Sequence, residues 1–485
     1  MNPLLSELIA VLKPGLREGR VHPDFPVTGI VNDSRQLQPD NLFVAIPGAR
    51  CDGHRFLTAA EQAGARASVI TDPAYYLPDR NRFLVTDAYA AYALLAERFA
   101  GSPAHRLQLA GVTGTNGKTT IAFMLHRMLT AAGHPCGLIS TIEYCFGNRS
   151  EIADRTTPEA GKLQQLFSGM VASGCTHAVM EVSSHALSQT RTGTARFAVA
   201  IFTNLTGDHL DYHRTMENYY QCKKRLFAEH TAGPAVINLD DPWGKRLAGE
   251  LPGVRVITYG QSPECTWRIG PLTQSPAGVE FELTGPHGSF RAAAPLPGEH
   301  NAYNLTAALV AADCLGLDPE AANAAVKTNF AVPGRLQYLA LPNGAAAYVD
   351  YAHTDDALAH VLDTLRPLCR GRLLVVFGCG GDRDKTKRPR MGAVAAAKAD
   401  LLFLTSDNPR TEDPLKIIAD VRAGIPAGSR LTVEPDRRLA IAAAFRQSVP
   451  GDLLLVAGKG HEDYQEINGV KHHFSDLEIL GSLVN

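Results

Sequence analysis

The sequence lacks both a strong charge excess and any long apolar run. Among its 485 residues, 47 basic and 49 acidic side chains give a net charge of −2. That balance offers no electrostatic footprint for nucleic acid or an anionic membrane. No apolar run approaches the ~18 residues of a membrane-spanning helix. The first apolar run contains Glu7 and has no basic residue before it, so a signal peptide is not expected either.

The cysteines lack the spacing of a metal site or of a disulfide framework. Nine are scattered along the chain, and none forms a Cys-x-x-Cys pair. An odd number without such spacing is typical of reduced thiols. We therefore expect a cytoplasmic protein, which we take to be a monomer.

The length predicts about three domains of ~150 residues each. A Gly-Ser-Pro segment at 101–103 is typical of a linker. We expect boundaries that give domains at 1–100, 101–331 and 332–485.

Residues 107–120 are typical of a phosphate-binding loop. An apolar run at 107–112 predicts a buried strand, a glycine-containing loop follows, and apolar residues at 121–129 recur at helical spacing. In such a unit, backbone N–H groups and the helix N-terminus bind phosphate. Lys118 is expected to reach the β- and γ-phosphates, and the Thr119 hydroxyl to bind Mg²⁺.

This loop departs from the common pattern G-x-x-x-x-G-K-[ST], because Val112 stands where that pattern has glycine. The alternative is a glycine turn between a strand and a helix that holds no ligand.

Two further strands are expected to carry polar residues at their ends. The apolar segment 176–181 ends at Glu181, whose carboxylate can hold Mg²⁺ directly or through water; the alternative is a surface glutamate. The segment 197–204 leads into two aspartates and two histidines at 208–213. Such clusters at the carboxyl end of a parallel strand are typical of ligand and metal sites. The alternatives are a helix N-cap and histidines satisfied by their neighbours.

Lys223 and Lys224 lie on a helix expected at 217–229. A lysine beside Mg²⁺ is electrostatically unfavourable unless its charge is removed. Residue chemistry alone therefore predicts that both lysines are solvated.

The first hundred residues predict an α/β unit. Strands are expected at 42–46 and 67–70, with a helix at 56–65 between them. Ser34 and Arg35 are candidates for holding a phosphate or a uracil edge. The alternative is an Asx turn with a solvated arginine.

Residues 332–485 predict a doubly wound parallel sheet, because continuous apolar runs alternate with helical segments. The strands are expected at 346–350, 373–378, 401–405 and 453–458. A polar cluster follows each strand, where open α/β sheets bind ligands. These clusters are 350–353, 380–385, 406–410 and 458–462. The predicted fold class is α/β with three domains: a central P-loop-type parallel-sheet ATPase domain, a C-terminal Rossmann-like doubly wound domain, and the N-terminal unit.

Four motifs together resemble the Mur ligase family, the ATP-dependent amide-bond ligases of peptidoglycan synthesis. They are Gly114–Thr120, Thr203–His213, the pattern His300-Asn-x-x-Asn304 and Pro333–Leu336. They follow the family's order over essentially the whole chain. The resemblance implies phosphorylation of a carboxylate by ATP and attack of an amino group on the acyl phosphate.

The resemblance also implies roles for individual residues in binding ATP and Mg²⁺. The phosphates are expected at Gly114, Thr115, Asn116, Gly117, Lys118, Thr119 and Thr120. Glu181 and His209 are expected as Mg²⁺ ligands, with Thr119 on the other metal ion. Lys223 falls where the family carries a carbamylated lysine, and that modification turns a cation into an anion. Adenine and ribose-phosphate contacts are expected from Asn301, Arg335, Asp350 and His353. The alternative for Asn301 and Asn304 is that they are helix-capping residues.

The family's muramoyl-peptide site matches Thr156, Thr157, Ser183, Gln189 and Arg191. Its uridine pocket, in an N-terminal UDP-sugar-binding domain, matches Ser34 and the loop of Ala49, Arg50 and Cys51. The family usually has His-Gln-Ala where this chain has Ala-Arg-Cys. Backbone contacts rather than side-chain contacts are therefore expected in that loop.

The segment Asp407-Asn408-Pro409-Arg410 resembles the motif of members that add meso-2,6-diaminopimelate rather than L-lysine to UDP-N-acetylmuramoyl-L-alanyl-D-glutamate. Arg383, Gly458 and Glu462 are expected to complete that site. Diaminopimelate differs from lysine by a distal carboxylate, which Arg410 and Arg383 can pair, while Glu462 can accept the distal ammonium. Lysine would leave a buried guanidinium unpaired, so a discrimination of ~10³-fold is expected.

Several alternatives remain open. Among enzymes they are the L-lysine-adding relative, the D-Ala-D-Ala-adding relative and folylpolyglutamate synthase. Outside enzymes, a nucleotide-dependent switch or binding module is possible, but it leaves the four strand-end clusters of the last domain unexplained.

Overall fold

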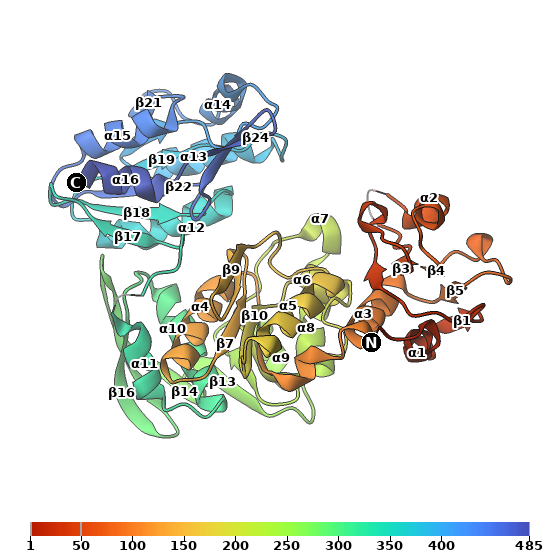
Figure 1. Ribbon diagram of the computed structural model, residues 1–485. Helices are drawn as coiled ribbons and strands as arrows, with labels where there is room; N and C mark the ends of the chain where they lie inside the picture. The colour runs from red at the N-terminus through yellow and green to blue at the C-terminus, as the bar shows by residue number, and fades with distance from the viewer. Residues whose placement is uncertain (1, 49–50, 329, 485) are drawn as a thin grey trace. The chain divides into compact units, whose positions relative to one another are not determined.

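The computed structural model describes residues 2–48, 51–328 and 330–484 (Figure 1). The chain divides into two compact units, Met1–Trp267 with Ala307–Ala322 and Arg268–Thr306 with Asn323–Asn485. The boundaries expected from the sequence, at residues 100 and 331, stay a prediction. In the described part of the chain, no helix is both long and apolar enough to cross a membrane.

The first unit begins with a five-stranded sheet in the order β1-β5-β4-β3-β2, parallel except for β1. Its strands are β1 (Leu16–Glu18), β2 (Gly29–Val31), β3 (Asn41–Val44), β4 (Ala67–Ile70) and β5 (Arg82–Val85). Its helices are α1 (Leu5–Ile9), α2 (Leu57–Gln62) and α3 (Ala88–Phe99). Side chains alternate between faces, so Leu42 and Val44 pack in one cluster with α1 and α3, whereas Phe43 packs in another with α2. The predicted strands and the helix between them are confirmed, although that helix is shorter than expected.

A larger sheet carries the phosphate loop. In the first unit its strand order is β13-β12-β11-β6-β10-β7-β8-β9, and the strands from β13 to β7 are parallel. The strands are β6 (Gln108–Thr113), β7 (Cys136–Ile139), β8 (Glu143–Phe146), β9 (Arg149–Ile152), β10 (His177–Glu181), β11 (Phe197–Phe202), β12 (Ala235–Asn238) and β13 (Val256–Gly260). The helices are α4 (Lys118–Ala131), α5 (Ala160–Ala172), α6 (Ser184–Ser188), α7 (Leu210–His213), α8 (Met216–Glu229) and α9 (Pro242–Gly249).

Strand register brings three candidate segments to one edge of this sheet. The central strand β6 pairs with β10 on one side, where Glu181 lies opposite Val112. It pairs with β11 on the other side, where Phe202 lies opposite Thr113. Because all three strands are parallel, Glu181, the glycine loop after β6 and the segment after β11 all lie at the carboxyl edge, as predicted.

The second unit contains an antiparallel meander of β14 (Trp267–Ser275), β15 (Gly278–Gly285) and β16 (Gly288–Ala294). The helices α10 (Glu299–Cys314) and α11 (Pro319–Lys327) follow in the chain.

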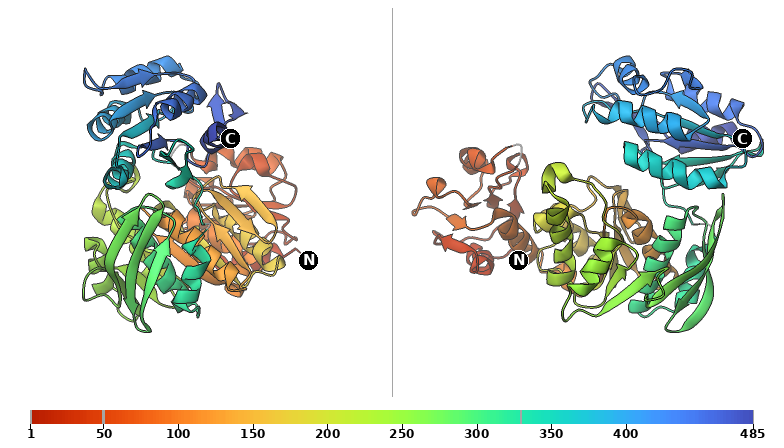
Figure 2. Two further views of the ribbon diagram at one scale, coloured as in Figure 1. Left: turned by 90° about the vertical axis from the view of Figure 1, so that its left-hand side faces the viewer. Right: turned by 180° about the vertical axis from the view of Figure 1, so that it is seen from behind.

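The rest of the second unit is a six-stranded sheet in the order β17-β18-β22-β19-β20-β21, parallel except for β17. The strands are β17 (Gln337–Ala340), β18 (Ala346–Asp350), β19 (Leu373–Phe377), β20 (Leu401–Leu404), β21 (Leu431–Val433) and β22 (Leu453–Ala457), and β23 (Tyr464–Ile467) and β24 (Val470–His473) form a separate hairpin. One face packs on α12 (Asp355–Leu365), α13 (Lys387–Lys398) and α14 (Pro414–Arg422), and the other on α15 (Arg437–Gln447) and α16 (Asp476–Val484) (Figure 2). The predicted doubly wound sheet is confirmed.

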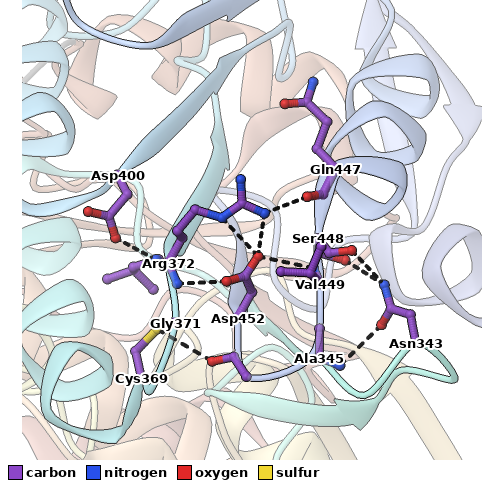
Figure 3. Close-up of polar contacts among 12 residues, drawn as sticks. Asn343, Ala345, Cys369, Gly371, Arg372, Asp400, Gln447, Ser448, Val449 and Asp452 are labelled. Carbon is purple, nitrogen blue, oxygen red and sulfur yellow. Dashed lines mark hydrogen bonds and ion pairs between the residues drawn. The ribbon is translucent and has the colours of Figure 1, made fainter.

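A polar network joins the amino ends of three of these strands (Figure 3). The Asp452 carboxylate, just before β22, accepts hydrogen bonds from the Arg372 backbone N–H at 2.7 Å and from Arg372 Nη2 at 2.7 Å. Asp400, just before β20, accepts from the Leu373 backbone N–H at 2.7 Å. These carboxylates satisfy backbone donors that the strands leave unpaired. They lie at the edge opposite the predicted ligand clusters, which points to a structural role.

Candidate active site

The phosphate loop has the backbone geometry that its glycines predict. Gly114 has φ +144° and Gly117, the N-cap of α4, has φ +88°. A Cβ atom at position 114 would overlap Thr203 Oγ1, so both conformation and space require glycine there. Lys118 Nζ donates to the carbonyl oxygens of Gly114 at 3.0 Å and Thr115 at 2.8 Å. Its positive charge therefore lies beside the backbone of the loop, at Gly114 and Thr115.

The segment after β11 holds this loop in place. The Thr115 N–H donates to the Asn204 carbonyl oxygen at 2.8 Å, and the Asn116 N–H donates to Asn204 Oδ1 at 3.0 Å. Thr203 Oγ1 donates to the Asn116 carbonyl oxygen at 2.6 Å. Thr119 and Thr120 are buried in the first turn of α4.

Glu181 is fully buried beside the loop, and Thr141 holds its carboxylate. The Thr141 N–H donates to Oε1 at 2.7 Å, and Thr141 Oγ1 donates to Oε2 at 3.1 Å. The alternative of a surface glutamate is therefore wrong. Sequence reasoning missed Thr141, for which a Ser-Thr pair directly after the apolar strand β7 was the available signal.

His209 lies on the exposed side of the segment after β11. Its ring is about half exposed, its backbone is left-handed at φ +53°, and its ring centroid is 4.9 Å from that of His185. The phenol ring of Tyr219 lies farther from the His209 imidazole, with centroids 6.4 Å apart. Within the described residues, no three His, Cys, Asp or Glu side chains gather closely enough to hold a metal ion alone.

Lys223 corrects the prediction from residue chemistry that it is solvated. Only 1% of it is exposed, and its Nζ donates to the Gly114 carbonyl oxygen at 2.8 Å. Burial, with a smaller contribution from nearby Lys118, lowers the pKa of Lys223 well below its ordinary value. Lys224, by contrast, is partly exposed and pairs with Glu250 at 2.8 Å. The register of α8 on the sheet thus turns Lys223, not its neighbour, toward the loop.

The residues matched to the muramoyl-peptide site form one connected cluster. Arg191 Nη1 donates to the Thr157 carbonyl oxygen at 2.6 Å, and its Nε donates to Gln189 Oε1 at 3.0 Å. The Ser183 N–H donates to Thr157 Oγ1 at 3.0 Å, and Thr157 Oγ1 donates to the Glu181 carbonyl oxygen at 2.8 Å. The cluster therefore reaches the end of β10.

Two further residues connect to this cluster. Thr156 Oγ1 lies within hydrogen-bond distance of Thr141 Oγ1, at 3.1 Å, so Thr141 links Thr156 to Glu181. Glu159 pairs with Arg191 at 3.1 Å. Sequence reasoning missed Glu159, because an acidic residue before a helix carries no distinctive signal.

The residues expected to form the uridine pocket are not joined to one another by hydrogen bonds among the described residues. Asp33 accepts a hydrogen bond from the Arg35 N–H and pairs with its guanidinium at 2.8 Å, while 86% of the Arg35 side chain is exposed. This is the Asx turn that was the alternative for that segment, with Ser34 partly buried in the turn. Cys51 is exposed. Ala49 and Arg50 lie outside the described residues.

In the second unit, two of the predicted nucleotide contacts are occupied by internal hydrogen bonds. Asn301 Nδ2 donates to the Pro297 carbonyl oxygen at 2.7 Å, and Asn301 Oδ1 accepts from Asn304 Nδ2 at 2.9 Å. Asp350 accepts from the backbone N–H groups of Leu336 and Ala352, both at 2.8 Å. Burial raises the pKa of Asp350.

Arg335 and His353 lie around Tyr351 in the same unit. The Arg335 guanidinium is 5.3 Å from the centre of the Tyr351 ring, and its buried Nε has no hydrogen-bond partner among the described residues. An orphaned buried donor is a feature that a polar or anionic ligand satisfies. His353 is exposed, and its ring centroid is 4.6 Å from that of Tyr351.

The predicted amino-acid site is built at the carboxyl ends of β20 and β22. Asn408 Nδ2 donates to Glu462 Oε2 at 2.8 Å. Arg410 has a left-handed backbone at φ +53°, and its Nη1 donates to the Gly381 carbonyl oxygen at 2.7 Å. Its Nε lies 3.3 Å from Glu466 Oε2. Burial raises the pKa of Glu462, and Lys459 opposes that shift.

The other residues of that prediction lie around this core. Asp407 is buried, and a Cβ atom at Gly458 would come within 2.7 Å of its Oδ2. Pro409 follows in the same loop, with its carbonyl oxygen against Gly381. Arg383 is exposed on the loop after β19. The structure thus joins Asp407–Arg410 with Gly458 and Glu462.

Models of known protein families match three successive parts of the chain, and all three describe Mur ligases. Three family models match: Mur ligase family, catalytic domain, at residues 26–99; Mur ligase middle domain at 112–312; and Mur ligase, glutamate ligase domain, at 334–460.

Relatives and solved structures give the same picture. The UDP-N-acetylmuramoyl-L-alanyl-D-glutamate--2,6-diaminopimelate ligase of Gloeobacter violaceus is 46% identical over 98% of this chain and 96% of its own. The Geobacter metallireducens protein of the same name is 42% identical over 99% and 98%. A solved structure of a ligase with that name is 36% identical, covers 95% of each chain and has a TM-score of 0.69.

The fold of this chain is accordingly the three-domain α/β architecture of these ligases. With a relative 46% identical across nearly its whole length, the chain belongs to the Mur ligase family.

Proposed function

We propose that this chain is an ATP-dependent ligase that joins meso-2,6-diaminopimelate to UDP-N-acetylmuramoyl-L-alanyl-D-glutamate. The observation that carries the proposal is the register of β6, β10 and β11, which gives one sheet edge the phosphate loop, the buried Glu181 and the segment after β11. The names of the relatives support the choice of substrates. We further propose that it works in the cytoplasm, where ATP and UDP-sugars are made, and as a monomer.

The first step activates a carboxylate that is a poor electrophile at neutral pH. The γ-carboxylate oxygen of the D-glutamyl residue attacks the γ-phosphorus of ATP, ADP leaves, and an acyl phosphate forms. Such a transfer depends mainly on positioning and charge neutralisation. Lys118, already beside the backbone of the loop, would stay beside the β- and γ-phosphates. Arg191 and Thr157 would hold the peptide end near Glu181.

The residues beside the loop fit Mg²⁺. Magnesium in such sites is held by one or two carboxylates, substrate phosphates and water, and Glu181 and Thr119 supply oxygen donors of that kind. Mg²⁺ would neutralise charge on the transferred phosphoryl group. A neutral Lys223 amine would attack the carbon of CO₂ and release one proton to solvent, so that its nitrogen would carry an anionic carboxylate beside the loop. His209 is a further candidate ligand for Mg²⁺.

The second step forms the amide bond. An amino group of diaminopimelate attacks the acyl phosphate carbon, phosphate leaves with the bonding electron pair, and the nitrogen loses a proton. Arg410 would pair the distal carboxylate and Glu462 would accept the distal ammonium. The adenine and ribose-phosphate parts of the nucleotide would be contacted by four residues of the second unit. These are Arg335, through its unpaired Nε, Asp350, through its carboxylate, Asn301 and His353.

One coupled assay tests the proposal. Purified full-length protein with ATP, Mg²⁺ and the UDP-sugar dipeptide should release phosphate only when diaminopimelate is added, and mass spectrometry should find the tripeptide product. L-lysine should support a rate lower by ~10³-fold. Equal rates with lysine would favour the lysine-adding alternative. ADP formation without a peptide bond would overturn the proposal.

A further inference from the structure

The proposed amino-acid site contains a fully buried lysine that the steps above do not use. Lys459 directly follows β22 and Gly458, and none of its side chain is exposed. The glycines on either side have left-handed backbone conformations, with φ +117° at Gly458 and +54° at Gly460. A lysine is rarely buried unless polar partners compensate its charge, so its partners are informative.

Those partners are two residues of the amino-acid site. Lys459 Nζ donates to Asn408 Oδ1 and to Glu462 Oε2, both at 3.2 Å. Asn408 Nδ2 donates to the same Glu462 oxygen at 2.8 Å. Glu462 Oε2 thus has two donors, whereas no described residue donates a hydrogen bond to Oε1. Oε1 is therefore the acceptor that remains for a ligand.

The loop that carries this lysine is fixed by close packing. A Cβ atom at Gly458 would come within 2.7 Å of Asp407 Oδ2, and one at Gly460 within 2.7 Å of Tyr351 Cβ. The loop is thus pressed against the ends of β20 and β18. The backbone on either side of Lys459 is therefore fixed, and the hydrogen bonds from Lys459 and Asn408 orient the Glu462 carboxylate.

The charge of Lys459 also bears on which amino acid the site prefers. Asp407 and Glu462 are neighbouring carboxylates, and Lys459 compensates part of their charge. Diaminopimelate brings both a carboxylate and an ammonium group at its distal end, whereas L-lysine brings only an ammonium group. A site that loses one positive charge should become relatively better for lysine.

We propose that Lys459 is a positioning residue for amino-acid selection, which holds Glu462 with Oε1 directed to the substrate ammonium and disfavours L-lysine through its charge. This inference rests on the proposed function.

The test is Lys459→Met in the full chain, with kcat and KM measured for diaminopimelate and for L-lysine. The KM for diaminopimelate should rise about tenfold. The kcat/KM for diaminopimelate divided by that for L-lysine should fall by about tenfold. The KM for ATP should change less than about twofold. Lys398→Met is the matched control, because Lys398 pairs with Asp363 on the surface of the same unit, at 2.6 Å. It should change none of these quantities.

A double-mutant cycle separates positioning from a merely structural role. In a Glu462→Gln background, Lys459→Met should add much less to the KM for diaminopimelate than it does alone, because the lysine acts through that carboxylate. A structural lysine would instead lower kcat with both amino acids alike.

Each outcome discriminates. If circular dichroism shows that Lys459→Met does not fold, Lys459→Gln keeps a hydrogen-bond donor without the charge and should show the same fall in the ratio. An unchanged ratio in a folded variant overturns this inference while leaving the proposed function intact. Failure of the wild-type protein to ligate diaminopimelate overturns the proposed function and this inference with it.

Discussion

Lys223 Nζ donates a hydrogen bond to the carbonyl oxygen of Gly114 at 2.8 Å, across 109 positions of the sequence. This contact joins the helix α8 to the phosphate loop. It also places an amine with a lowered pKa beside the cation of Lys118. Two like charges so close in a buried place are unfavourable, so a lysine at this position is best accommodated as a neutral amine or as a carbamate.

The first prediction concerns that carbamate. Wild-type protein equilibrated with ¹³C-bicarbonate should show a carbamate carbonyl signal by NMR, because a neutral buried amine reacts with CO₂. Lys223→Ala should lack the signal and should lose ligase activity by at least on the order of 10²-fold. Lys224→Ala, the neighbouring control, should retain both. A wild-type spectrum without the signal under assay conditions would remove the carbamate from the proposal.

The second prediction concerns the loop lysine. Lys118→Ala should lower phosphate release on the order of 10²–10³-fold, because it removes a fixed positive charge from the transferred phosphate. Lys245→Ala serves as control, since Lys245 is largely exposed and lies 3.8 Å from its partner Glu264. Turnover by Lys118→Ala close to the wild-type rate would show that the loop takes no part in phosphoryl transfer.

The third prediction tests whether the loop geometry needs glycine. Gly114→Ala places a methyl group onto Thr203 Oγ1 at a φ of +144°, a strain of about 1–3 kcal/mol. Nucleotide affinity measured by isothermal titration calorimetry should fall about tenfold or more. Gly249→Ala is the control, because a Cβ atom there meets no atom within 4 Å. Wild-type affinity in Gly114→Ala would mean that the loop adapts without cost.

The fourth prediction concerns amino-acid choice. Arg410→Ala should lower kcat/KM for diaminopimelate by about 10²-fold and should reduce the preference over L-lysine, while the KM for ATP stays the same. Arg390→Ala removes a surface arginine that pairs with Asp355 at 2.7 Å and should be neutral. Loss of activity with an unchanged preference for diaminopimelate would argue that Arg410 only supports the loop.

The fifth prediction concerns stability at the opposite edge of that sheet (Figure 3). Burial by itself would raise the pKa of Asp452, but hydrogen bonds from Arg372 outweigh it, so the pKa lies below its ordinary value. Asp452→Asn should lower the local opening free energy of β19 and β22 by about 1–3 kcal/mol, measured by hydrogen exchange with mass spectrometry.

The pH dependence of that effect has a definite sign. Because the folded-state pKa of Asp452 is depressed, its contribution is complete above the unfolded-state pKa of ~3.9 and is lost as the pH falls through the folded value. The difference between the two proteins should therefore be constant from neutral pH to about pH 5 and shrink below about pH 4. Asp363→Asn, a surface control, should cost less than about 0.5 kcal/mol. A difference that grows toward acid would contradict the assignment.

Much of the fold could be predicted because the relevant signals are local. The apolar run at 453–458 became β22, and the helical spacing after Lys118 became α4. Gly114 and Gly117 predicted a loop that requires positive φ, and both have it. Since parallel strands end at one edge of a sheet, the order of strands and helices also predicted where the polar clusters lie.

The partners of polar side chains could not be predicted in the same way. Three such contacts join positions that are far apart in the sequence. The hydrogen bond from Lys223 to Gly114 spans 109 residues, that from Thr141 to Glu181 spans 40, and that from Lys459 to Asn408 spans 51. Periodicity reports which face of an element is apolar, but not which distant backbone carbonyl or carboxylate will meet a given amine. Those choices depend on strand order and helix register, which exist only after the chain has packed. Local pattern was therefore sufficient for the architecture and the edge of the site, whereas the charge state and orientation of its side chains came from packing between distant segments.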